Sequence, residues 1–217
     1  MILVVGGTKG GAGKSTLAAN LTVIRASEGR DVLLIDADDQ GSTIEFTRQR
    51  NDRTEGNAGY TAIQSFEADV AVQVRNLTPK YDDIIIDVGG RDTVSQRAAL
   101  AVAHTLIMPF SPTSIDLWTD EHMIELLKDA RPFNPALCAW AFINKAFPSG
   151  SDNAEAAAIL YEYADHWQFL DTPIGNRKVF STTFGKGYAV TEITPRDAKA
   201  VAEIMALYVH IFNAISV

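Results

Sequence analysis

Residues 1–16 have the sequence MILVVGGTKGGAGKST, and this stretch decides the fold. The apolar run at positions 2–5 ends at glycine, which predicts a strand buried on both faces. The glycines that follow let the backbone turn tightly and aim successive N–H groups at an anion. From Lys14 to Glu28, apolar residues recur at helical spacing, and Gly29 is a typical helix stop. A strand, a glycine-rich loop and a helix in this order predict a phosphate-binding loop.

The rest of the chain repeats this alternation of buried strands and helices. Further strands are predicted at 32–35, 60–66, 84–86, 105–108, 137–143 and 169–173. Further helices are predicted at 42–50, 69–77, 95–103, 115–130, 153–167 and 195–213. Such alternation is typical of a mostly parallel central sheet with helices on both faces, a three-layer α/β/α fold. We expect one domain over residues 1–217, with ligands at the carboxyl ends of the strands.

The composition excludes several classes of protein. The chain is 47% hydrophobic and 21% charged, which is ordinary for a globular protein and argues against wholesale disorder. The formal net charge of −8 excludes a uniformly basic nucleic-acid binder but leaves room for a local basic patch. The one cysteine, Cys138, cannot form an intramolecular disulfide, and in an apolar strand it is expected to be a small core residue. We expect a cytoplasmic protein.

The glycine-rich loop carries side chains for nucleotide chemistry. Lys14 can reach the β- and γ-phosphates, and the Ser15 hydroxyl can ligate Mg²⁺. The simple Walker pattern requires glycine where this chain has Thr8, so the loop fits instead the deviant form, from Lys9 to Ser15. The residues predicted to contact the nucleotide are Gly10, Gly11, Ala12, Gly13, Lys14, Ser15 and Thr16.

Polar side chains follow three of the predicted strands. Asp36 and Asp38 come after the strand at 32–35, and Asp87 comes directly after the very apolar strand at 84–86. Magnesium prefers oxygen ligands and keeps several waters, so Asp87 suits a contact with Mg²⁺ through water. Asn144 follows the strand at 137–143, where a hydrogen bond to an adenine edge and a plain loop role are both open.

The run from Lys9 to Ser15 resembles the deviant Walker A motif of the ParA/MinD family of ATPases. Ile35–Gly41 is similar to the second motif of that family, with Asp39 in place of the usual proline, and Ile84–Asp87 is similar to its Walker B strand. Val88–Gly90 stands where many relatives have a proline-containing segment. The resemblance covers nearly the whole chain and implies a P-loop NTPase fold with ATP/ADP and Mg²⁺ as cofactors. Because the sequence starts at the first strand, it resembles the small ParA type, without an N-terminal helix-turn-helix.

The resemblance also implies roles for individual residues. Lys9 is expected to reach across a dimer to the partner's nucleotide, and Asp38 to orient or deprotonate the attacking water. Asp36 is expected to support the magnesium shell. The resulting catalytic set is Lys9, Lys14 and Asp38. The metal set is Ser15, Asp36 and Asp87.

One segment near the C-terminus carries an excess of positive charge. From Gly175 to Lys199 there are two acidic residues, Glu192 and Asp197, and five basic ones, so the segment carries +3 and the remainder −11. The basic residues are Arg177, Lys178, Lys186, Arg196 and Lys199. Such a segment can hold a phosphate backbone loosely and without reading its sequence. An ordinary solvated surface is the competing interpretation.

The motifs themselves indicate Mg²⁺-dependent nucleotide binding and hydrolysis, and the family resemblance implies an ATP-dependent dimerising switch ATPase for plasmid or chromosome partitioning. As the family resemblance implies, the ATP-bound homodimer would bind DNA nonspecifically at the nucleoid and be reset by a small ParB-like DNA-binding adaptor. Higher-order assembly and the cargo stay open. One alternative is positioning at a membrane or cell pole, MinD-like or linked to conjugation. No Lys or Arg follows Lys199, so an amphipathic basic anchor is missing and we expect no membrane partner. The other alternative is an ATP-dependent small-molecule ligase of the dethiobiotin synthetase type.

Overall fold

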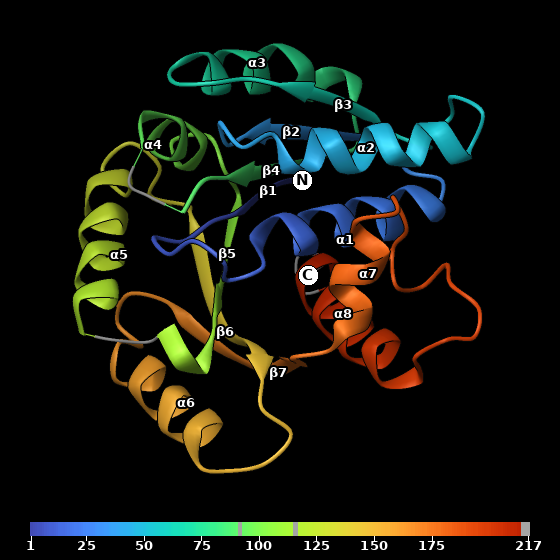
Figure 1. The fold of residues 1–217 in the computed structure, drawn as a ribbon. Coiled ribbons are helices and arrows are strands. Elements are labelled where there is room, and N and C mark those ends of the chain that lie inside the picture. Colours follow the sequence, from blue (N-terminus) through green and yellow to red (C-terminus); the bar gives the residue numbers. More distant parts are fainter. Residues whose placement is uncertain (91–92, 115–116, 214–217) are drawn as a thin grey trace.

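The computed structural model describes residues 1–90, 93–114 and 117–213. Seven strands form one sheet in the order β3-β2-β4-β1-β5-β6-β7, and every neighbouring pair is parallel (Figure 1). The strands are β1 (Ile2–Val5), β2 (Val32–Ala37), β3 (Thr61–Gln64), β4 (Asp83–Val88), β5 (Thr105–Phe110), β6 (Cys138–Ala146) and β7 (Gln168–Gly175). The predicted three-layer α/β/α fold is confirmed.

Helices cover both faces of the sheet, with α3 to α6 packed on one face and α1, α7 and α8 on the other (Figure 1). The helices are α1 (Lys14–Ser27), α2 (Ser42–Arg53), α3 (Asp69–Leu77), α4 (Val94–Leu100), α5 (Leu117–Ala130), α6 (Asp152–Glu162), α7 (Lys178–Phe184) and α8 (Ala198–Asn213). Short 3₁₀ turns, η1 (Thr78–Lys80) and η2 (Pro112–Ser114), follow α3 and β5. In β1, Ile2 and Val4 join one core and Leu3 and Val5 the other, which explains the continuous apolar run.

The strand order places β1 in the middle of the sheet, between β4 and β5. The chain first builds the half that contains β2, β3 and β4, and then crosses to β5 on the other side of β1. The reversal of strand order leaves a crevice at the carboxyl end of β1, the usual ligand site of such a sheet. The loop after β1 begins in that crevice, and the ends of β2 and β4 lie beside it.

Several boundaries differ from the sequence prediction. Helix α7 was not predicted, because a stretch as short as Lys178–Phe184 shows too little helical periodicity. Helix α8 starts at Ala198 rather than at Pro195, because the Asp197 carboxylate accepts a hydrogen bond from the Ala200 N–H and caps the helix. The expected start of α5 at 115–116 lies outside the described residues.

Cys138 was predicted to be a small core residue, and this prediction is wrong, because Cys138 is exposed at the first position of β6. None of the helices in the described ranges combines the length and apolarity that crossing a bilayer requires.

Candidate nucleotide site

The loop between β1 and α1 has backbone conformations that favour glycine. Gly11 and Gly13 have positive φ values of 75° and 93°, and Gly13 is the residue directly before α1. A side chain on Gly13 would also bring its Cβ to 2.4 Å from the Asn144 Nδ2 atom. The first turn of α1 holds no acidic residue, and no described side chain caps it. Its N–H groups are therefore available to an anion in the loop.

Two consecutive residues at the end of β6 hold this loop from one side. Lys145 Nζ donates to the Gly11 carbonyl at 2.6 Å, and Asn144 Nδ2 donates to the Ala12 carbonyl at 2.6 Å. In a trans peptide the carbonyl and the next N–H point in opposite directions. Fixing these carbonyls toward β6 therefore turns the N–H groups of Ala12 and Gly13 away from it, as an anion site requires.

For Asn144 the sequence left a contact with adenine and a plain loop role open, and here its amide NH₂ faces the phosphate loop. The adenine contact stays a prediction. Lys145 was not singled out from the sequence, although it directly follows Asn144. Its backbone has a positive φ of 57°, which is unusual for a lysine.

Lys14 points back into the loop it follows. Its Nζ donates to the Lys9 carbonyl at 2.7 Å, and only 6% of the residue is exposed. Burial lowers the pKa of Lys14, while the carboxylates of Asp87 and Asp38 oppose that shift. The ammonium is therefore close to the acidic side chains predicted to serve Mg²⁺ and water. A nucleotide phosphate would replace the Lys9 carbonyl as its partner.

Asp36 and Asp87 lie side by side on β2 and β4, and both are fully buried. Asp36 holds the start of α2, because one oxygen accepts from the Thr43 and Ile44 N–H groups at 2.9 Å. Its other oxygen accepts from the Asp38 N–H at 3.2 Å. These backbone donors occupy the carboxylate that was predicted to support the magnesium shell, and that role stays a prediction.

Asp87 has the opposite environment. No hydrogen bond of ordinary geometry reaches either of its oxygens from the described residues. Burial, aided by Asp36 and Asp38, raises the pKa of Asp87 to about 8, while the nearby Ser15 hydroxyl and Lys14 ammonium partly offset the shift. An unpartnered buried carboxylate beside a serine hydroxyl fits a hydrated Mg²⁺, which would supply the missing positive charge and hydrogen-bond donors. Among the described residues, no three His, Cys, Asp or Glu side chains could hold a metal alone, so phosphate and water would complete its shell.

The turn after β4 lies directly against the phosphate loop. A Cβ built on Gly90 would lie 2.6 Å from the Gly10 nitrogen and 2.7 Å from the Lys9 carbonyl carbon. On the neighbouring Gly89, a Cβ would meet the Asp38 carboxyl group at 3.5 Å. The Gly89–Gly90 pair therefore brings Asp38 and the start of the loop together.

Two cavities flank the loop. One of about 250 Å³ is bounded by Gly13, Thr16, Asn144 and Lys145, and by the segment from Ile174 to Ser181. This cavity adjoins the first turn of α1, where a nucleoside attached to a loop-bound phosphate would lie. The other, of about 190 Å³, adjoins Gly10, Gly11 and Ala12 on the other side of Lys145.

Of the predicted DNA-binding residues, Arg177 is engaged within the chain. Its guanidinium contacts both oxygens of Glu203, at 2.5 Å and 2.9 Å, and it borders the 250 Å³ cavity. The other four, Lys178, Lys186, Arg196 and Lys199, are exposed. The sequence also did not predict that Glu192 binds Arg50 in a bidentate ion pair at 2.7 and 2.8 Å. The Arg50–Glu192 pair connects the end of α2 to the C-terminal segment, while Asp36 accepts hydrogen bonds from the start of α2.

Comparison with known proteins gives a consistent result. The model of the CobQ/CobB/MinD/ParA nucleotide binding domain matches residues 3–212. Maintenance of carboxysome distribution protein A of Halothiobacillus neapolitanus is 25% identical over 203 residues, covering 93% of this chain and 92% of that protein. A Cyanothece McdA variant in complex with ATP has a TM-score of 0.77 at 16% identity, covering 98% and 96% of the two chains. A plasmid partition protein from Borrelia burgdorferi has a TM-score of 0.63 at 20% identity, covering 86% and 95%.

Proposed function

The chain belongs to the CobQ/CobB/MinD/ParA family of nucleotide-binding domains and is a P-loop ATPase, and from this we propose that it is a nucleotide-switched positioning ATPase. In this proposal the ATP-bound chain forms a homodimer, holds DNA without reading its sequence, and is released when a partner stimulates hydrolysis. The observation that carries the proposal is the phosphate loop with its second lysine, Lys9, backed by an unpartnered buried Asp87.

Hydrolysis in this site rests on charge neutralisation and positioning. The N–H groups of the loop and of the first turn of α1 hold the phosphates, and Lys14 moves from the Lys9 carbonyl to the terminal phosphate. Bound Mg²⁺ supplies further positive charge on the phosphate oxygens. Ser15 and Asp87 would hold this ion, and Asp38 orients the attacking water next to Gly89.

The cargo is proposed from the relatives. The family resemblance of the sequence favoured plasmid or chromosome partitioning. The relative that matches nearly the whole chain is named for the distribution of carboxysomes, which supports a protein assembly as the cargo. The adaptor would then be a protein bound to that assembly rather than a ParB-like protein bound to a DNA site. Fluorescence imaging of the labelled adaptor distinguishes these cargoes. The adaptor would lie on a nucleic-acid locus if the cargo is DNA, and on a protein body if the cargo is a protein assembly.

DNA is proposed as the surface along which the cargo is positioned, at the nucleoid in the cytoplasm. Lys178, at the start of α7, and Lys186, two residues after its end, are both exposed. The one acidic residue between Lys186 and Arg196 is Glu192, which is paired with Arg50. Because Arg177 is paired with Glu203, the segment keeps the net positive charge that its composition gives, carried by exposed lysines and Arg196.

The experiment is a DNA-binding titration by fluorescence anisotropy, with two duplexes of unrelated sequence and equal length, in ATP and in ADP. We expect equal binding to both duplexes in ATP and much weaker binding in ADP. Lys186→Glu should weaken binding to both duplexes, whereas Lys80→Glu, an exposed lysine next to α3, should not. Equal binding in ATP and ADP would contradict the switch, and equal loss in both variants would contradict the DNA surface.

The two alternatives each have a direct test. Co-sedimentation with anionic liposomes in ATP would favour a membrane surface over DNA. ATP turnover that requires a small-molecule acceptor, and that DNA and the adaptor leave unchanged, would favour the ligase.

A further inference from the structure

A groove runs along the free edge of the sheet, between β7 and α6, at the bottom of the molecule in Figure 1. Its volume is about 430 Å³. The floor is apolar and comes from β7, from α6 and from the loop between β6 and α6. It is formed mainly by Phe147, Pro148, Ala154, Ala157, Phe169 and Pro173.

The floor is open to solvent rather than covered by the chain. Ala154, Pro148 and Pro173 are exposed. Beside the groove, the Tyr161 ring packs at a tilt against Phe169, with 4.6 Å between the ring centroids, yet 56% of the tyrosine is exposed. Apolar and aromatic surface of this kind is typical of a site that anchors one or two side chains of a partner.

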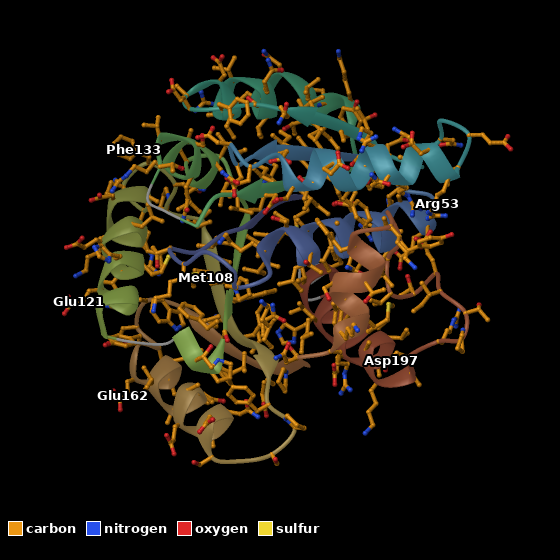
Figure 2. The ribbon with its side chains drawn as sticks, viewed as in Figure 1. Arg53, Met108, Glu121, Phe133, Glu162 and Asp197 are labelled. Atoms are coloured by element: carbon orange, nitrogen blue, oxygen red, sulfur yellow. The ribbon has the colours of Figure 1, made fainter. Side chains whose placement is uncertain are left out.

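The segment that forms most of the groove is acidic. Residues 146–176 contain five acidic residues and no Lys or Arg. They are Asp152, Glu155, Glu162, Asp165 and Asp171, and all five are exposed. Asp171 lines the groove, and Asp152 and Glu155 directly adjoin its lining residues Asn153 and Ala154, whereas Asp165 borders another cavity. Glu162 projects outward from the end of α6 in Figure 2. The only basic residue in the described lining, Arg177, is paired with Glu203, so it does not offset the acidic rim.

We propose that this groove binds a basic segment of a partner protein, anchored by apolar side chains. Charge complementarity decides the occupant, because lysines or arginines of such a segment would face Asp171, Asp152 and Glu155 while its apolar residues cover the floor. A second copy of the chain would bring the same acidic rim against itself, and DNA or an anionic lipid surface would be repelled.

The position of the groove connects it to the nucleotide site. Asn176 and Arg177, at the end of β7, border both the groove and the 250 Å³ cavity beside the phosphate loop. Phe147 borders both the groove and the cavity next to Gly10–Ala12. A bound segment would therefore touch residues that also face the nucleotide. The identity of this partner rests on the proposed function, in which a partner protein stimulates ATP hydrolysis; the binding of a basic segment in the groove does not.

The test uses a fluorescein-labelled synthetic peptide of repeating leucine-lysine pairs, titrated with the full chain in the absence of nucleotide and DNA. Asp171→Lys changes the charge of the rim, and Ala154→Trp fills the groove at an exposed position without changing charge. Asp31→Lys is the matched control, because Asp31 is exposed before β2 at the other end of the sheet. We expect both groove variants to bind the peptide about tenfold more weakly and the control to bind it like the wild type.

The outcomes separate the possible occupants. Equal weakening by Asp171→Lys and Asp31→Lys, with no effect of Ala154→Trp, would show general attraction to an acidic protein and overturn the proposal. Absence of binding would also overturn it. Loss of self-association in Ala154→Trp, measured by sedimentation, would assign the groove to a second copy instead. Because DNA and nucleotide are absent, failure here is distinct from failure of the DNA switch, which the anisotropy titration reports.

Discussion

Replacing Gly90 with alanine is predicted to disturb the phosphate loop, whereas the same change at Gly89 is not. The added Cβ at Gly90 would lie 2.6 Å from the Gly10 nitrogen and 2.7 Å from the Lys9 carbonyl carbon. Both are backbone atoms of the phosphate loop, so they cannot turn aside as a flexible side chain would. At Gly89 the added Cβ would approach the Asp38 carboxyl group no closer than 3.5 Å, an ordinary contact.

The size of the effect follows from these distances. Carbon atoms in good contact are about 3.5–4.0 Å apart, so the loop or the end of β4 must move by roughly 1 Å. Forcing extra volume into a packed site typically costs about 1–3 kcal/mol. If the displaced loop loses that much binding free energy for phosphate, nucleotide affinity falls by about 5- to 150-fold.

The assay is titration with a fluorescent ATP analogue in the presence of Mg²⁺, with circular dichroism to check that both variants are folded. We expect Gly89→Ala to bind within about twofold of the wild type. Equal losses in the two variants, or wild-type affinity in Gly90→Ala, would refute the close approach of residue 90 to the loop.

Three further predictions follow from single contacts. Lys145→Ala removes the hydrogen bond to the Gly11 carbonyl and should cost about 1 kcal/mol of nucleotide binding, roughly fivefold in the same titration, with rescue in Lys145→Arg. Because burial raises the pKa of Asp87 to about 8, this group stabilises the nucleotide-free fold at low pH and loses its contribution as pH rises from about 4 to about 8. Thermal unfolding of Asp87→Asn should therefore depend less on pH over that range, and an unchanged profile would contradict this reasoning. Glu192→Ala leaves the buried Arg50 without its carboxylate and should lower the free energy of unfolding by about 2 kcal/mol, measured by urea denaturation.

The sequence was sufficient to predict the fold because its signals are local. The apolar run before Gly6, the glycines of the loop and the triple isoleucine at 84–86 each indicate their element without reference to any other part of the chain. Short elements lacked such a signal. Helix α7 has only seven residues, and its helical state depends on packing Phe180 into the core beneath α1.

The side-chain contacts of the site could not be predicted, because they join residues far apart in the sequence. Asn144 is 132 residues from Ala12, and its amide turns to the loop only because β6 and β1 end at the same edge of the sheet. The contact between the Asp36 carboxylate and the N–H groups of the first turn of α2 was likewise not predicted. Lys145 could have been found, since it immediately follows Asn144 at the end of a predicted strand.

The measurement that tests the nucleotide switch most directly is the mass of the protein in solution by light scattering, with a non-hydrolysable ATP analogue and with ADP. The chain has a mass of 23.6 kDa. We predict twice that mass with the ATP analogue and a single chain with ADP, and a single chain in both for Lys14→Ala. The same mass in both nucleotides, for the wild type, would contradict the switch.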